Sequence, residues 1–336
     1  MVGKHESGGI GAGTGVHTNT GIGTGKGIGA GIGAGALWGL VFLAPQLAPG
    51  FTPLQLSAGR YLAYGLAAAV LIAPSWRRLA AVLAWRDWCA LAWLGFTGNI
   101  LYYVLLAQAV RGGGVAMAAL VIGLLPLAVT LVGSREHGAV ALRRLLPSLA
   151  LGLAGLACTS RQSLATLGRD ALPGLLCALG ALVSWTVYAV GNSRRLAGLR
   201  ALSPHDWNLL TGVATGIEAL LLALPAFFPH LLPAGVGPDA PVHAAADWLR
   251  FAAIAGGVAI LCSIVGNGLW NVASRALPLT LMGQMIVFET IFAAGYGFLW
   301  ERRWPTGLEA AALALLVAGV ASCAAVHRRD GRQPDG

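Results

Sequence analysis

Charged side chains are scarce in this sequence, and that scarcity limits the class of protein. Asp, Glu, Lys and Arg make up 10% of the 336 residues, whereas apolar residues make up 57% and the mean hydropathy is +0.72. A soluble domain usually carries about 25% charged residues. The composition therefore argues against a cytosolic enzyme, a disordered regulator and a disulfide-rich secreted domain. It indicates an all-α polytopic membrane protein.

Motifs for catalysis, metal binding and nucleotide binding are also absent from the sequence. The 5 cysteines are scattered, without a CxxC pair or a Cys/His pair at metal-ligand spacing. No GxSxG, HExxH or Walker-type loop occurs, and the 7 histidines fall outside the long apolar runs. We therefore expect no metal, no cofactor and no enzymatic activity. An intramembrane enzyme acting on a lipid or small metabolite stays open as the alternative.

Long apolar runs between short polar breaks predict ten transmembrane helices. A helix needs about 20 apolar residues to cross the hydrocarbon core at about 1.5 Å per residue. The runs lack the two-residue alternation of barrel strands, so they favour helices over a β-barrel. Residues 1–27 are Gly-rich, and we expect a flexible tail there. The predicted spans are 28–48, 52–74, 88–109, 114–133, 145–161, 172–191, 207–228, 249–272, 278–299 and 307–326.

The basic residues predict the orientation of these spans. With the N-terminus in the cytoplasm, 15 of the 22 Lys and Arg residues fall on the inner side and 6 on the outer side, with Arg60 left inside a span. The positive-inside rule then places both termini in the cytoplasm, as expected for an even number of spans in a multi-pass protein of the inner (plasma) membrane. The net charge of +9 therefore follows from topology, and we expect no nucleic-acid partner.

The two halves of the sequence resemble each other. Gly98-Asn99 in the third predicted span has a counterpart in Gly266-Asn267 of the eighth, and Pro53 at the start of the second has one in Pro204 at the start of the seventh. Five spans is an odd number, so two tandem copies have to lie upside down relative to each other. Inverted repeats around a midplane site are a transporter architecture. We expect repeats over 28–162 and 172–327, followed by a cytoplasmic tail over 328–336.

Several of these motifs together resemble a known family. They are Ala36-Leu37-Trp38-Gly39, Pro53 followed by Arg60, Pro126 followed by Glu136, and Phe298-Leu299-Trp300-Glu301. In these motifs the chain resembles an EamA-type member of the drug/metabolite transporter superfamily, and the resemblance covers about residues 30 to 327. The resemblance implies ten helices with the fifth and tenth at the periphery, a central cavity lined by both halves, and export or exchange of small metabolites. The ninth span departs from the pattern, since it has Glu289 near the place where the fourth has Pro126.

Three charged residues inside predicted spans are candidates for substrate binding or coupling. Arg60 lies about 12 Å into its span, where insertion of a cation costs about 2.5–3.5 kcal/mol, so it should face a partner or water. Arg60 either binds an anion or forms half of an ion pair, moving or fixed. Glu289 is either a coupling or substrate-binding carboxylate or the structural partner of Arg60. Glu218 is a third candidate, with an interhelix hydrogen bond as its alternative role.

Polar and aromatic residues in the spans complete the candidate site. Buried amides bind polar groups of a substrate or join helices, and ring faces accept apolar groups and cations. Helix packing is the alternative for each of them. The candidates are Asn99, Asn267, Asn271, Trp38, Tyr64, Trp185 and Trp270.

These observations predict a secondary transporter that exports small amphipathic metabolites, such as amino acids or related compounds, by alternating access around a midplane cavity. The expected partners are a small-molecule substrate and the lipid bilayer, with protons as a candidate coupling ion and a candidate homodimer. Gly212 with Gly216, and Gly256 with Gly257, predict places where helices approach closely.

Overall fold

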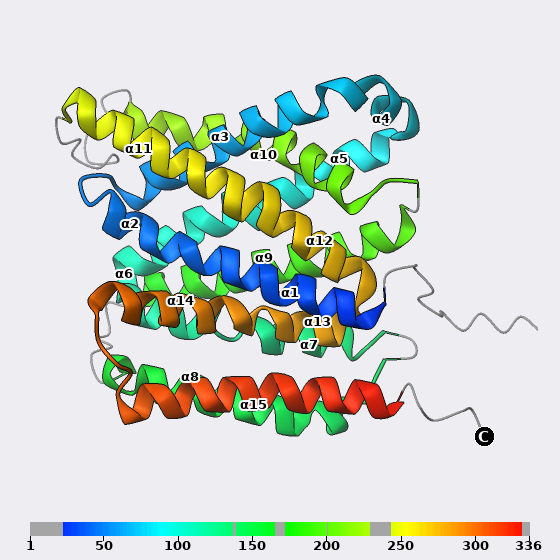
Figure 1. The fold of residues 1–336 in the computed structure, drawn as a ribbon, viewed down its shortest axis with the longest axis vertical. Helices are drawn as coiled ribbons and strands as arrows, with labels where there is room; N and C mark the ends of the chain where they lie inside the picture. Colours follow the sequence, from blue (N-terminus) through cyan, green and yellow to red (C-terminus); the bar gives the residue numbers. More distant parts are fainter. Residues whose placement is uncertain (1–22, 137–138, 165–171, 200, 229–242, 331–336) are drawn as a thin grey trace, which may run out of the picture.

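The apolar runs fold into long helices that lie side by side (Figure 1). The computed structural model describes residues 23–136, 139–164, 172–199, 201–228 and 243–330, and these residues contain helices and no strands. The predicted flexible tail lies outside them, except that the first helix already begins at Thr24. The all-helical class is therefore confirmed for the described part of the chain.

The first half of the chain forms helices α1 to α8. Some spans consist of several helical segments that follow one another without a loop. The elements are α1 (Thr24–Gly39), η1 (Leu40–Leu43), α2 (Ala44–Leu47), α3 (Pro53–Ile72), η2 (Ala73–Ser75), α4 (Trp76–Val82), α5 (Trp85–Gly95), η3 (Phe96–Leu101), α6 (Tyr102–Ile122), α7 (Leu125–Gly133) and α8 (Leu142–Leu164).

The second half forms helices α9 to α15. Its α11, η6 and α12 form one long continuous helix, as α5, η3 and α6 do in the first half. The elements are α9 (Leu172–Gly198), α10 (Pro204–Phe227), α11 (Ala245–Val258), η6 (Ala259–Gly266), α12 (Asn267–Ala276), α13 (Leu279–Met285), α14 (Val287–Glu301) and α15 (Gly307–Asp330).

Eight helices in the described residues are long and apolar enough to cross a membrane. They correspond to eight of the ten predicted spans; the exceptions are the predicted fourth and fifth spans, 114–133 and 145–161. The chain is helical at both places, but α7 has only 9 residues after a break at Gly123-Leu124, and α8 contains Arg143, Arg144 and Pro147 near its start. A span count of ten therefore stays a prediction.

Side-chain caps define where the helices begin. Thr52 accepts a hydrogen bond from the Gln55 amide at 3.2 Å and precedes Pro53, the first residue of α3. Ser203 likewise accepts from the Asp206 amide at 3.0 Å before α10. Such caps satisfy amides that have no partner within the helix, and proline fits the first helical position because its missing N–H is not needed there.

Small residues allow the closest helix contacts. A Cβ atom added to Gly65 in α3 would lie 2.4 Å from the Cα atom of Gly216 in α10, so these two backbones touch. Gly212 in α10 also lies against α3, and the close approach predicted for Gly212 and Gly216 is confirmed. The same prediction is wrong for Gly256 and Gly257, where an added Cβ would meet nothing within 4 Å. These two glycines lie on an open face of α11.

The helix pairs join the two halves of the chain. The pairs α3 with α10, α6 with α9, α8 with α15 and α7 with α13 are in contact, and α1 packs against both α12 and α14. In Figure 1, α8 and α15 run along each other at one edge of the bundle. The start of α1 and the end of α15 lie at the same end of the bundle (Figure 1). This placement agrees with two termini on one side of a membrane.

Candidate functional site

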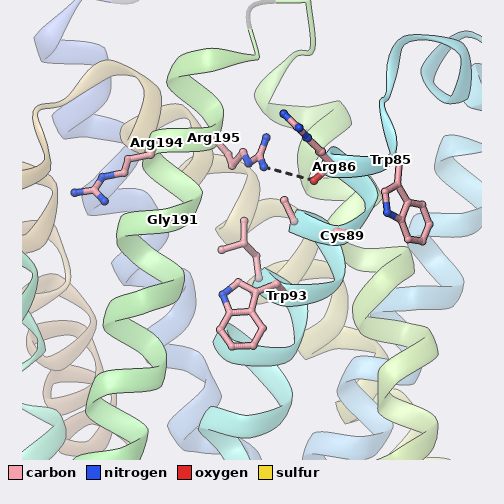
Figure 2. Close-up of a pocket in the computed structure, with 9 residues that line it drawn as sticks. Trp85, Arg86, Cys89, Trp93, Gly191, Arg194 and Arg195 are labelled. Atoms are coloured by element: carbon pink, nitrogen blue, oxygen red, sulfur yellow. Dashed lines mark hydrogen bonds between the residues drawn. The ribbon is translucent and has the colours of Figure 1, made fainter.

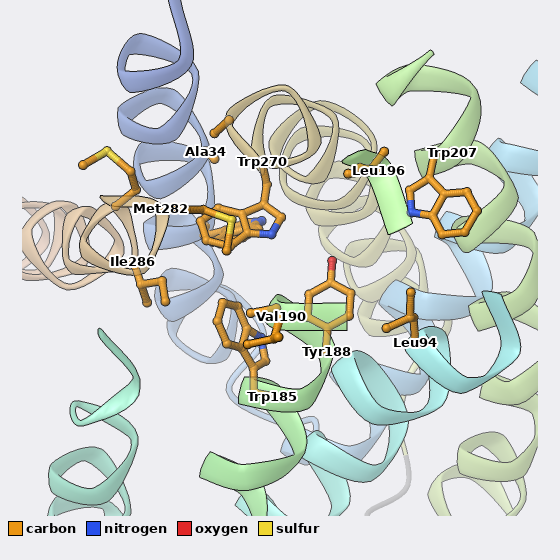
Figure 3. Close-up of a cluster of buried hydrophobic side chains, with 14 of the residues drawn as sticks. Ala34, Leu94, Trp185, Tyr188, Val190, Leu196, Trp207, Trp270, Met282 and Ile286 are labelled. Carbon is orange, nitrogen blue, oxygen red and sulfur yellow. The ribbon is translucent and has the colours of Figure 1, made fainter. Parts of the chain in front are cut away.

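Three tryptophans predicted for the site form one cluster between the halves. The ring centroids of Trp38 and Trp270 lie 5.1 Å apart, those of Trp185 and Trp270 5.8 Å apart, and those of Trp38 and Trp185 6.3 Å apart. Tyr188 extends the cluster from α9, with its ring 5.7 Å from Trp185 (Figure 3). All four side chains are buried. These edge-on and tilted arrangements are the favourable ones for aromatic pairs.

Two spans contain π-helical segments, η3 in the third and η6 in the eighth. In a π-helical turn, some carbonyl groups lose the hydrogen bond that they would accept in an α-helix from the backbone N–H four residues later. Other donors then have to bind these carbonyls. Trp38 donates its indole N–H to the Cys262 carbonyl at 3.1 Å and to the Asn267 Oδ1 at 2.9 Å. Ser184 donates to the Thr97 carbonyl of η3 at 2.7 Å. Side chains of other helices therefore stabilise both segments.

Tyr64 is part of this internal scaffold. Its hydroxyl donates to the carbonyl and the Oδ1 of Asn208, at 2.8 and 2.7 Å, and its side chain has no exposed surface. The Asn208 amide in turn donates to the carbonyls of Ser263 and Ile264 in η6, at 3.3 and 2.8 Å. In this conformation Tyr64 holds helices together and lines no open space.

The predicted asparagines also act between helices. Asn99 donates to the Thr215 hydroxyl at 3.0 Å. Asn271 accepts a hydrogen bond from the Asn192 amide at 2.9 Å and is buried. The Asn192 Oδ1 accepts the indole N–H of Trp207 at 2.8 Å. Each of these amides is thus bound to another helix, which is the joining role weighed for them in the sequence.

Arg60 lies between the two halves, beside η6. Its Nε donates to the Ser263 hydroxyl at 3.0 Å, and its guanidinium carbon lies 5.3 Å from the ring centroid of Tyr61. Glu289 is close enough to interact electrostatically with Arg60, and Tyr102 lies within reach of both charges. Among the described residues, Arg60 and Glu289 form no ion pair within 4.0 Å. We call Arg60, Tyr61, Tyr102, Ser263 and Glu289 the central polar cluster.

The position of Glu289 follows from a break in the ninth span. Helix α13 ends at Met285, and α14 begins at Val287 with Glu289 in its first turn. The amide end of a helix carries a partial positive charge, so it favours a carboxylate there. Gly35 of α1 packs against the backbone at Glu289, because a Cβ atom added to Gly35 would lie 2.8 Å from the Glu289 amide nitrogen. The helix thus breaks here without a proline.

Glu218 lies apart from the central polar cluster. It packs in α10 against Gly95 of α5, where an added Cβ would lie 3.0 Å from the Glu218 Oε2 and 3.1 Å from the Thr215 Oγ1. Its Oε2 is buried without a hydrogen-bond partner among the described residues. Of the two carboxylates considered for Arg60, Glu289 is therefore the one nearby.

Sequence reasoning missed several polar residues that the site uses. Ser263 binds Arg60, and Asn208 and Asn192 hold the surrounding helices. Ser263 lies within an apolar run, whereas Asn192 and Asn208 lie next to polar and charged residues near the ends of their spans. The desolvation argument that singled out Arg60 would have found Ser263 if it had been applied to neutral polar residues, but the sequence around Asn192 and Asn208 carries no such signal.

Comparison with known proteins agrees with this arrangement. Residues 25–161 match the EamA-like transporter family. The inner membrane protein YtfF of Escherichia coli (strain K12) is 33% identical over 304 residues, which cover 84% of this chain and 90% of YtfF. The chain belongs to the EamA-like transporter family. The resemblance to the drug/metabolite transporter superfamily seen in the sequence is thereby confirmed.

A solved crystal structure has the same fold as this family member. It covers 91% of this chain and 98% of its own, with a TM-score of 0.71 and 21% sequence identity. Together with the eight candidate spans, family membership identifies a membrane transporter homologue.

Proposed function

We propose that this protein is a secondary exporter of small amphipathic metabolites that works by alternating access around the central polar cluster. One observation carries the proposal: Arg60 of the first half and Glu289 of the second lie within electrostatic range of each other, without an ion pair between them in the described structure. Opposite charges at this depth in a bilayer are expensive unless they bind something.

The chemistry of the cluster favours a zwitterionic substrate such as an amino acid. A guanidinium binds a carboxylate by charge-assisted hydrogen bonds, and the Glu289 carboxylate suits an ammonium group. Tyr61 and Tyr102 add aromatic surface for the apolar part of the same molecule. Glu289 is also the candidate group for proton coupling, because a carboxyl group in this setting can exchange a proton with its surroundings.

The inverted repeat is part of the proposal, and three findings support it. Matched positions carry matched caps: Asp87 binds the Ala84 amide before α5, and Asp247 binds the Ala244 amide before α11, each at 3.0 Å. Both following spans contain a π-helical segment. The family match ends at residue 161, at the end of the proposed first repeat of 28–162.

The helix pairing supports the same symmetry. In the proposed repeat, each of the first five spans corresponds to one of the last five. The contacting pairs α3 with α10, α7 with α13 and α8 with α15 each join two corresponding spans, so exchanging the halves leaves these contacts unchanged. The contacts of α1 with the eighth and ninth spans correspond to those of α9 with η3, α6 and α7. Because most Lys and Arg residues fall on one side of the predicted spans, we also propose that the protein lies in the inner membrane with both termini in the cytoplasm.

The proposal is tested by flux into and out of proteoliposomes loaded with a panel of amino acids and related compounds. We expect saturable counterflow that Glu289→Gln reduces by at least ten-fold and makes independent of pH. Glu218→Gln is the matched control, because it removes a carboxylate that also lies inside a candidate span but outside the central polar cluster. We expect this variant to keep most of the flux. Flux and pH dependence unchanged by Glu289→Gln would contradict the role of the cluster.

A further inference from the structure

A groove on the outside of the bundle lies between α5 and α9, and none of its lining residues belongs to the central polar cluster. It has a volume of about 620 Å³ and is lined by the start of α5 and the end of α9. Figure 1 shows this part of α5 at the end of the bundle where the described ends of the chain lie. Figure 2 shows the residues that line the groove, with Arg86 and Arg195 close together at one end, which we call its mouth, and Trp93 farther along α5.

The mouth of the groove is positively charged. Arg195 donates to the Asp87 carboxylate at 3.1 Å and to the Arg86 carbonyl at 3.5 Å, which fixes its guanidinium beside Arg86. Arg194 turns away to Glu136, at 3.0 Å. The Arg86 guanidinium itself has no hydrogen-bond or ion-pair partner in the described part of the chain, so it is available for an anion.

Below the mouth, the groove is apolar. Trp93 lies seven residues along α5 from Arg86, which is about 10 Å deeper at 1.5 Å per residue. Trp93 is 55% exposed, and Trp85 beside the mouth is 78% exposed. Leu94 of α5 packs against Gly191 of α9, where an added Cβ would lie 2.9 Å from the Leu94 Cδ2. Exposed tryptophans at helix ends are typical of the boundary between lipid headgroups and acyl chains.

We propose that this groove binds one anionic phospholipid. Its phosphate lies between the guanidinium groups of Arg86 and Arg195, and the upper part of an acyl chain lies along Trp93 and Leu94. Both walls of the groove belong to membrane-spanning helices, so lipid is the molecule that meets it in a bilayer. Basic pockets between such helices on the cytoplasmic side recognise acidic headgroups.

Native mass spectrometry of the purified full chain tests the proposal. The protein is titrated with phosphatidylglycerol and, separately, with phosphatidylethanolamine of the same acyl chains. We expect preferential retention of phosphatidylglycerol and about a five-fold loss of its affinity in Arg86→Gln. Arg77→Gln is the matched control, because it removes an exposed arginine that does not line the groove. We expect it to change nothing.

Three results would overturn the proposal. They are equal retention of the two lipids, equal losses in Arg86→Gln and Arg77→Gln, and displacement of the lipid by inorganic phosphate, which would indicate a site for free anions. Trp93→Ser is a second variant, which keeps the charges and removes the apolar wall. We expect it to weaken phosphatidylglycerol binding as well, and unchanged binding would contradict the acyl-chain part. The measurement needs no transport, so it is independent of the function proposed above.

Discussion

The contact between Gly65 and Gly216 leads to a sharp prediction about stability. In Gly65→Ala, the new methyl group would lie 2.4 Å from a backbone atom of α10, and a backbone cannot rotate out of the way as a side chain can. Overpacking of this kind costs about 1–3 kcal/mol. Alanine gains back about 1 kcal/mol in helix propensity. We therefore expect the free energy of unfolding to fall by up to about 2 kcal/mol, and a wider separation of α3 and α10.

Gly256→Ala is the matched control for this prediction. It makes the same chemical change in a membrane-spanning helix, but the new methyl group meets nothing within 4 Å. Only the propensity gain remains, so we expect this variant to be as stable as the wild type or slightly more stable.

Thermal unfolding of the detergent-solubilised protein compares the two variants. Gly65→Ala should unfold several degrees below the wild type, and Gly216→Ala should do the same because it lies on the other side of the same contact. If Gly65→Ala and Gly256→Ala unfold at the same temperature, the backbone contact between α3 and α10 does not constrain the fold, and the reasoning is refuted.

Two further predictions concern the hydrogen bonds around η6. Trp38→Phe leaves the Asn267 Oδ1 and the Cys262 carbonyl without their indole donor, so we expect the free energy of unfolding to fall by about 1–3 kcal/mol. Trp304 is 91% exposed, and we expect the control Trp304→Phe to leave the free energy of unfolding unchanged. Asn208→Leu removes the side-chain amide that binds two η6 carbonyls and the Tyr64 hydroxyl, so we expect a larger fall in the free energy of unfolding than for Trp38→Phe. A variant as stable as the wild type would show that η6 does not need these hydrogen bonds.

Hydropathy alone could predict most of the helices, because a bilayer leaves a long apolar segment few alternatives to a helix. It could not predict the irregular backbone within the spans. The π-helical segments depend on which side chains of other helices bind the freed carbonyls, and Trp38 reaches η6 from more than two hundred residues away in the chain. Pro126 marks the break in the fourth span, but the ninth breaks without a proline.

The candidate site was predictable in part for a similar reason. Desolvation singles out Arg60 and Glu289, since charge inside a span has to face something polar, and the structure places them near each other. The same argument cannot say which helices are neighbours, so it could not separate Glu289 from Glu218. The role of Tyr64 depends wholly on the position of Asn208 in another helix, and spacing along the chain carries no information about that.

Ser263 connects the irregular backbone to the charged site. It belongs to η6, its carbonyl is bound by Asn208, and its hydroxyl accepts from Arg60. A change in the winding of η6 therefore shifts the hydroxyl that orients Arg60, because both groups are on one residue. Alternating access requires that substrate charge and helix conformation affect each other. If this chain works by the alternating access proposed above, Ser263 is the residue through which the winding of η6 and the orientation of Arg60 affect each other.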